Sequence, residues 1–260
     1  MKTREEYFYL LKVQYLGLRY HGWAKQKNVK TVQGMIERSF ENVLGHDRFK
    51  TLGASRTDGR VSANMSAFEL FTFEPVEIEG TVEALNRLLP YDIKILSMEE
   101  TDASFNIIQH AKVKEYLYLF ASAQENHPYC SPIMVCMREE MDIALMQEGA
   151  KLFEGVHNFQ KYCKKPSADT VFEREILLSE IVENDLFKAN FFPERSYIYR
   201  VKGKGFLRNQ VRLMVGTLMR LGLGEITLQD IEESLKGGDN QPIGFLAPPT
   251  GLQLYNMEFL

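Results

Sequence analysis

The stretch Val113–Phe120, VKEYLYLF, decides the fold class of this sequence. In an extended strand its even-numbered residues, from Lys114 to Phe120, lie on one face, and Val113, Leu117 and Leu119 lie on the other. Large side chains on both faces indicate a strand that is covered on both sides. The stretch therefore predicts a strand within a central sheet.

Strands and helices follow one another without strict alternation along the rest of the chain. Strands are predicted over residues 7–15, 67–73, 175–182, 197–201 and 252–259. Apolar spacing and capping residues predict helices over residues 32–44, 82–89, 142–153, 211–218 and 227–236. This order favours the α+β class with an antiparallel sheet over a doubly wound fold. We expect two halves, residues 1–105 and residues 106–260.

Composition narrows the class of protein further. The chain has 260 residues, 45% of them apolar, and can bury a substantial core. No apolar run reaches the roughly 18 residues of a membrane span, so we expect a cytoplasmic protein. Three cysteines and five histidines lack the spacing of a zinc site, so we expect reduced thiols and no metal. A net charge of -4 argues mildly against nucleic acid, although basic residues cluster in residues 25–30, 161–165 and 200–220.

The stretch Gly53–Ala63, GASRTDGRVSA, is the first candidate for a functional site. It places Arg56 and Asp58 among small residues and turn formers. An Asp-Gly pair is common in turns, where the aspartate bonds to nearby backbone. The alternative is a pair of site residues on a loop whose backbone a ligand can approach closely. The loop by itself leaves both interpretations open.

Six segments resemble, in the same order along the chain, the motifs of the tRNA pseudouridine synthase A family. The pattern AxRTDxxVxA within the loop resembles the family's GRTDAGVHA, and GVHNF (155–159) resembles its GxHDF turn. The other segments are YLGLRYHGWAKQKNVKTVQ (15–33), KEYLYLF (114–120), GFLRNQVRLMVGTLMRLG (205–222) and APPTGLQL (247–254). Together they span nearly the whole chain, which chance agreement does not explain.

The resemblance implies an isomerase that converts uridine to pseudouridine in the anticodon stem-loop of tRNA. The N1 glycosidic bond is cut, the base rotates, and C5 is joined to the same ribose, so no cofactor is needed. The resemblance also implies two α+β halves that share a mainly antiparallel central sheet, with the active cleft between them. A homodimer that binds one tRNA is expected, with no membrane and no nucleotide cofactor.

Three residues take a catalytic role through this resemblance. Asp58 matches the family's catalytic aspartate, whose carboxylate acts as nucleophile or base and stays ionised beside a cation. Arg212 matches the arginine that pairs with it, and a solvated arginine beside an apolar stripe is the alternative. Tyr116 matches the tyrosine that stacks on uracil and helps proton transfer at C5, with a core aromatic as the alternative. Tyr118 is expected in the core.

RNA contacts are expected because a uridine within a stem must be extruded before it reacts. Arg56 matches the family arginine that props the gap left behind, and a surface salt bridge is the alternative. The remaining candidates are basic residues for which a solvated face is the alternative: Arg60, Lys25, Lys27, Lys161, Lys164, Lys165, Lys204 and Arg208.

The loop departs from the family pattern at Ser55, Gly59, Arg60 and Ser62, and Leu16 replaces an aspartate of the opening motif. Because the aspartate, tyrosine and arginine are kept, we expect retained chemistry with an altered target, or a paralogue of a more typical enzyme. One rival is a noncatalytic RNA-binding or RNA-chaperone protein. A second rival, a metal-dependent phosphohydrolase built on Asp58, has no obvious ligand set in the sequence.

Overall fold

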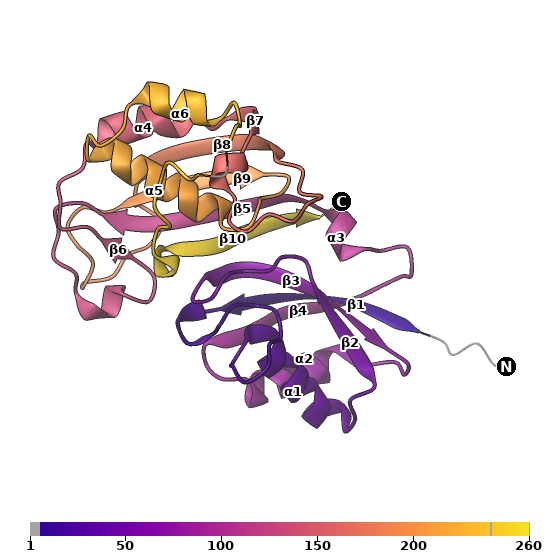
Figure 1. The fold of residues 1–260 in the computed structure, drawn as a ribbon. Coiled ribbons are helices and arrows are strands. Elements are labelled where there is room, and N and C mark those ends of the chain that lie inside the picture. Colours follow the sequence, from indigo (N-terminus) through magenta and orange to yellow (C-terminus); the bar gives the residue numbers. More distant parts are fainter. Residues whose placement is uncertain (1–5, 240, 260) are drawn as a thin grey trace. The chain divides into compact units, whose positions relative to one another are not determined.

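The computed structural model describes residues 6–239 and 241–259, and it divides the chain into two compact units (Figure 1). Unit 1 comprises Met1–Lys112 with Leu254–Leu260, and unit 2 comprises Val113–Gln253. The last strand thus packs with the start of the chain. Within the described ranges, no helix is both long enough and apolar enough to cross a membrane.

Unit 1 is a sheet with two helices on one side (Figure 1). The strand order is β4 (Ile93–Thr101), β1 (Tyr7–Tyr15), β3 (Ser62–Thr72) and β10 (Leu252–Phe259), and β2 (Phe49–Gly53) also pairs with β3. The helices are α1 (Val32–Leu44) and α2 (Ile78–Leu88), and a short helix, α3 (Ile107–His110), ends the unit. Phe40 of α1 meets Phe68 of β3 edge to face, with ring centroids 6.4 Å apart, in the core between helix and sheet.

Unit 2 repeats this arrangement with different elements. Its strand order is β5 (Ala111–Ala121), β9 (Tyr197–Gly203), β8 (Glu173–Glu183) and β7 (Gly155–Asn158), and the two-residue strand β6 (Val135–Cys136) pairs with β5. Helix α4 (Ile143–Lys151) packs on β8 and against α5 (Gln210–Gly222) and α6 (Leu228–Ser234). The ladders β1/β3, β1/β4, β2/β3, β5/β9, β8/β9 and β7/β8 are antiparallel, whereas β5/β6 is parallel. The predicted α+β class with mainly antiparallel pairing is confirmed.

Four short 3-10 helices complete the part of the chain that the structure describes: Gly17–Arg19, Pro128–Cys130, Gln160–Tyr162 and Pro249–Gly251. The three cysteines are free thiols, two of them buried. The segment GVHNF, which resembles a family turn, forms the edge strand β7 and continues into the third of these helices.

Local signals explain where several elements begin and end. The Thr31 hydroxyl accepts a hydrogen bond from the Gly34 N–H at 3.3 Å, and Gly45 ends α1 in the left-handed conformation with φ +73°. Thr227 and Asp230 form a reciprocal capping box at the start of α6. These caps confirm the boundaries predicted for α1 and the start predicted for α6.

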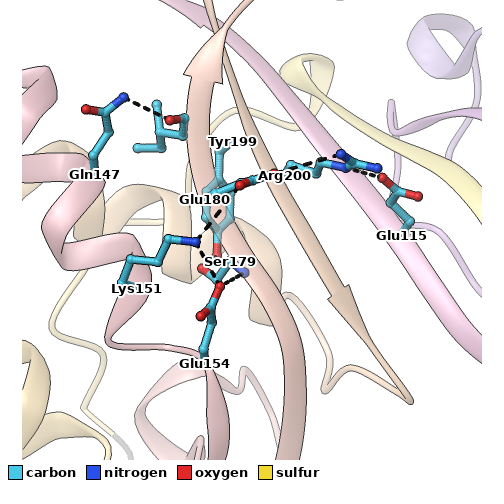
Figure 2. A network of polar contacts seen from close by, with 9 residues as sticks. Glu115, Gln147, Lys151, Glu154, Ser179, Glu180, Tyr199 and Arg200 are labelled. Carbon is cyan, nitrogen blue, oxygen red and sulfur yellow. Dashed lines mark hydrogen bonds and ion pairs between the residues drawn. The ribbon is translucent and has the colours of Figure 1, made fainter.

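A network of charged side chains ties β5, β9, β8 and α4 together (Figure 2). Glu115 of β5 is only 4% exposed and pairs with Arg200 and with Lys202, whose Nζ lies 3.4 Å from its carboxylate. Arg200 also lies 3.8 Å from Glu180 of β8, and Lys151 of α4 lies 3.9 Å from the same carboxylate. Because Glu115 precedes Tyr116 on β5, the network lies on the opposite face of the strand from that tyrosine.

Candidate functional site

The loop that carries Asp58 joins β2 to β3 and is held by the segment that precedes α1. The Thr57 carbonyl accepts a hydrogen bond from the Trp23 N–H at 3.2 Å, and the Thr57 hydroxyl bonds to the Tyr15 hydroxyl at 2.8 Å. The Tyr20 carbonyl accepts a bond from the Arg60 N–H at 2.9 Å. The residues on both sides of Asp58 are therefore fixed by backbone contacts rather than left as a free loop.

Two glycines allow this close approach of backbone to backbone. A Cβ at Gly22, where φ is +99°, would lie 2.6 Å from the Thr57 carbonyl oxygen. A Cβ at Gly17 would lie 2.1 Å from the Val61 carbonyl oxygen. Trp23, 2% exposed, completes the brace, because its ring lies directly over Gly53 at the end of β2. The opening motif thus supports the Asp58 loop structurally.

Asp58 opens a tight turn within this loop. Its carbonyl accepts a hydrogen bond from the Val61 N–H at 3.2 Å, and Arg60 adopts a left-handed backbone with φ +67°. Asp58 is partly exposed, whereas Arg56 and Arg60 are exposed. The loop therefore presents one carboxylate and two guanidinium groups from a single fixed turn.

Asp92 supports the same loop indirectly, through Tyr20. Its role could not be recognised from the sequence. Its carboxylate accepts bonds from Tyr20 Oη at 2.6 Å and from Arg19 Nε at 2.7 Å. Burial opposes ionisation of Asp92, but these hydrogen bonds outweigh it and lower its pKa. Since the Tyr20 carbonyl holds Arg60, Asp92 helps fix the turn after Asp58.

Tyr116 lies in unit 2, in the middle of β5, against a phenylalanine from the segment before α5. Its ring and that of Phe206 meet edge to face at 5.2 Å with an interplanar angle of 85°. Phe206 belongs to the GFL motif of the sequence, but only the structure shows that it contacts Tyr116. Tyr118 is fully buried and donates a hydrogen bond to the Pro248 carbonyl at 2.9 Å, so its predicted place in the core is confirmed.

Arg212 lies on α5, and the segment around Ala247, which passes over that helix, holds its side chain. It is 9% exposed, and its Nε donates to the Ala247 carbonyl at 2.7 Å, while the Ala247 N–H donates to the Arg212 carbonyl at 3.2 Å. The positive charge of Arg212 also acts on the Tyr118 hydroxyl, whose pKa is nevertheless raised by burial. Arg212 is thus a buried and anchored cation rather than the solvated arginine of the alternative.

Several of the predicted RNA contacts are engaged in ion pairs within their own unit. Lys25 pairs with Glu37 at 2.8 Å, Lys204 with Glu175 at 2.5 Å, and Lys161 with Asp239 at 3.4 Å. A backbone hydrogen bond from the Lys164 N–H to the Arg208 carbonyl, at 3.1 Å, brings these two predicted contacts together. The side chains of Lys27, Lys164, Lys165 and Arg208 are exposed.

Comparison with known proteins leads to the same family as the sequence motifs. A family model described as "tRNA pseudouridine synthase" matches residues 150–259. The chain is 32% identical to tRNA pseudouridine synthase A of Acetivibrio thermocellus over 247 residues, covering 95% of this chain and 97% of that protein. It is 34% identical to the protein of the same name from Pseudothermotoga lettingae, and 32% to tRNA pseudouridine synthase A 2 of Bacillus thuringiensis subsp. konkukian. These alignments cover 95% and 96% of this chain and 97% and 99% of the relatives.

The chain belongs to the tRNA pseudouridine synthase family. The predicted enzyme class, an isomerase, is confirmed by this membership.

Two positions where this synthase departs from the family loop differ in their local consequences. Arg60 replaces a glycine at the one residue of the turn whose φ is strongly positive. Ser62 replaces a histidine, and its hydroxyl accepts a hydrogen bond from the Gly17 N–H at 2.9 Å in a buried position. Ser62 therefore holds the opening motif of the synthase.

The catalytic candidates of the synthase fall into both units. Asp58 belongs to unit 1, where Arg56 and Arg60, predicted as RNA contacts, share its loop, while Tyr116 and Arg212 belong to unit 2. Among the described residues, no three histidine, cysteine, aspartate or glutamate side chains form a group that could hold a metal ion.

Proposed function

We propose that this chain isomerises uridine to pseudouridine in the anticodon stem-loop of tRNA, with Asp58 as the catalytic carboxylate. The observation that carries the proposal is the fixed turn at Asp58, in a chain that aligns over 95% of its length with tRNA pseudouridine synthases. A turn that is fixed by backbone hydrogen bonds holds the Cα of Asp58 in one place, which reduces the reorganisation needed before its carboxylate attacks or accepts a proton.

The reaction balances without an external reagent. The bond between ribose C1′ and uracil N1 breaks, a bond between C1′ and C5 forms, N1 gains a proton, and the proton at C5 is lost. Tyr116 would stack on the rotating uracil and assist the proton transfer at C5, held in place by Phe206. Arg212, anchored to the Ala247 carbonyl, would pair with Asp58 and keep it ionised.

Binding of the stem-loop would rely on the basic residues. Arg56 would prop the position that the extruded uridine leaves, while Lys164 and Arg208, held together by their backbones, would contact phosphates. A homodimer that binds one tRNA remains part of the proposal, and a tRNA substrate would place the protein in the cytoplasm.

Mapping of pseudouridines tests the proposal and its target. RNA would be compared from a strain that lacks the gene and from that strain complemented with wild type or with Asp58→Asn. We expect pseudouridines of the anticodon stem-loop to return with wild type only. Loss and return of pseudouridines elsewhere would support a synthase with a shifted target. Full complementation by Asp58→Asn would contradict the catalytic role and favour the noncatalytic RNA-binding alternative.

A further inference from the structure

Tyr91 presents an aromatic ring to solvent from the turn between α2 and β4. Its relative exposure is 111%, so both faces of the ring meet water. Leu88, at the end of α2, is 53% exposed and adds a second apolar side chain next to this turn. Scattered exposed apolar residues are common on folded proteins, so exposure alone does not indicate a binding site. What distinguishes Tyr91 is how firmly its turn is held and which loop it is joined to.

The backbone on both sides of Tyr91 is fixed. The Ile93 N–H donates a hydrogen bond to the Pro90 carbonyl at 2.9 Å, which closes a tight turn. The Asp92 carbonyl accepts a hydrogen bond from the Leu16 N–H at 2.9 Å, which ties the turn to the end of β1. Because a tyrosine has only two side-chain torsions, a ring on such a turn loses little conformational entropy when it binds a ligand.

The turn is joined to the Asp58 loop by a short chain of hydrogen bonds within unit 1. The Asp92 carboxylate binds the Tyr20 hydroxyl at 2.6 Å, and the Tyr20 carbonyl holds the Arg60 N–H at 2.9 Å. Arg60 in turn lies two residues after Asp58. Tyr91 and the candidate catalytic carboxylate therefore belong to one fixed framework, and an extended ligand that binds at Asp58 can reach both.

The charges next to this turn favour an anionic ligand. Two nearby carboxylates are each bound to an arginine: Asp92 to Arg19 at 2.7 Å, and Glu83 of α2 to Arg87 at 2.6 Å. The Arg19 side chain nevertheless stays 63% exposed, so a phosphate can approach it. Lys94 of β4 is exposed and adds a further positive charge. Exposed aromatic rings beside cations are typical of surfaces that bind single-stranded nucleic acid.

We propose that the Tyr91 ring stacks on an unpaired base of the tRNA substrate, at a nucleotide other than the one that reacts. This proposal rests on the proposed function, which makes RNA the ligand of the Asp58 loop. Every base offers a π face, so stacking on an aromatic side chain needs no particular sequence. Tyr91 is then a binding residue that takes no part in the chemistry. Its loss weakens binding of the RNA without slowing the reaction of the bound complex.

Three variants separate stacking from the other contacts that this side chain could make. Tyr91→Ala removes the ring, Tyr91→Phe keeps the ring without the hydroxyl, and Tyr91→Leu keeps an apolar side chain without a π face. Tyr129→Ala is the matched control, because Tyr129 is a 71% exposed tyrosine of unit 2 whose ring already contacts His127 and Phe191. Since the Tyr91 ring is fully exposed, each Tyr91 variant should unfold at the wild-type temperature.

Titration with tRNA transcripts that carry tritium at uridine C5 gives the Kd of each purified protein. Mixing with the protein in saturating excess gives the single-turnover rate of tritium release. We expect Tyr91→Ala to weaken Kd about fivefold or more, with its rate at saturation within about twofold of wild type. Tyr91→Phe should bind like wild type, and Tyr91→Leu should bind like Tyr91→Ala.

A Kd for Tyr91→Ala within about twofold of that for Tyr129→Ala would overturn the proposal. Wild-type affinity of Tyr91→Leu would also overturn it, because an apolar contact would then suffice. So would a change in oligomeric state of Tyr91→Ala in sedimentation, since the ring would then bind another copy of the chain. If wild type binds the transcripts and releases no tritium, the proposed function fails, while the Kd values still decide whether Tyr91 contacts RNA.

Discussion

Arg60 occupies a backbone conformation that suits glycine better than arginine. Its φ of +67° lies in the left-handed region, where a Cβ crowds the following carbonyl and costs about 1–2 kcal/mol. The neighbouring backbone fixes this geometry, because the Arg60 N–H bonds to the Tyr20 carbonyl and the Val61 N–H bonds to the Asp58 carbonyl. The chain thus keeps a strained arginine two residues from its candidate catalytic aspartate.

Arg60→Gly is expected to raise the free energy of unfolding by about 0.5–1 kcal/mol, since relief of strain exceeds the added entropy of the unfolded chain. Arg60→Ala removes the charge but keeps the Cβ, so it serves as the control and should change the free energy of unfolding little. Urea unfolding of the three proteins measures the difference. An Arg60→Gly protein less stable than Arg60→Ala would contradict this interpretation.

The stability that Asp92 contributes to the Asp58 loop depends on pH. Since its pKa is lowered in the folded protein, its contribution to stability is present above the ordinary aspartate pKa of about 4. The contribution is lost as the pH falls through the lower folded pKa. We expect Asp92→Asn to cost about 1–2 kcal/mol at pH 7, because two hydrogen bonds to a carboxylate are weakened.

The difference in unfolding free energy between wild type and Asp92→Asn should shrink below pH 4. Chemical denaturation at a series of pH values measures it. A difference that stays constant from pH 7 to pH 3 would show that the Asp92 charge does not support the loop.

At the scale of elements, α5 and the segment that crosses it position Arg212. Gly216 allows the crossing, because a Cβ there would lie 1.8 Å from the Phe245 carbonyl oxygen. Gly244 does the same from the other side, with Thr217 beneath it. The segment Gly244–Phe245, which shortly precedes the APPTG motif, is therefore in close contact with α5.

Gly216→Ala is expected to destabilise the protein by about 1–3 kcal/mol, although alanine is the better helix former. The clash is with backbone, so the segment must shift and the bond between Arg212 and Ala247 must lengthen. Gly205→Ala, where nothing lies within 4 Å of the added Cβ, is the matched control. Equal unfolding free energies for the two variants would contradict this account of the helix.

Elements with local signals could be predicted from the sequence, and those that depend on a partner strand could not. The predicted ends of β1 and α1 agree with the structure because aromatic alternation and capping residues mark them. The five-residue strand β2 and the four-residue strand β7 were missed, since each pairs with a single neighbour. Asp58 could be found from its motif, whereas Asp92 could not, because its partner Tyr20 is 72 residues away.

At the scale of the whole molecule, the chain returns to unit 1 with its last strand. The Tyr255 carbonyl of β10 accepts a hydrogen bond from the Asn64 side chain of β3 at 3.2 Å. A fragment that ends at residue 112 lacks this strand and leaves unpaired the part of one β3 edge that β2, which pairs with Phe68–Thr72, does not cover. We expect that fragment to be less stable than the full chain and to aggregate.

Adding residues 252–260 to the fragment through a flexible linker should restore cooperative unfolding, which circular dichroism during heating would detect. If the bare fragment to residue 112 unfolds cooperatively at the temperature of the full chain, the last strand is not required for unit 1.

The release of tritium from uridine C5 of tRNA transcripts, by wild type and by Asp58→Ala, tests the central claim most directly. We expect release by wild type, none by Asp58→Ala, and the same Kd for RNA and the same unfolding temperature for both proteins. Release by Asp58→Ala at the wild-type rate would contradict the role of Asp58. Tight binding without release by either protein, across a full set of cellular tRNAs, would contradict the synthase activity itself.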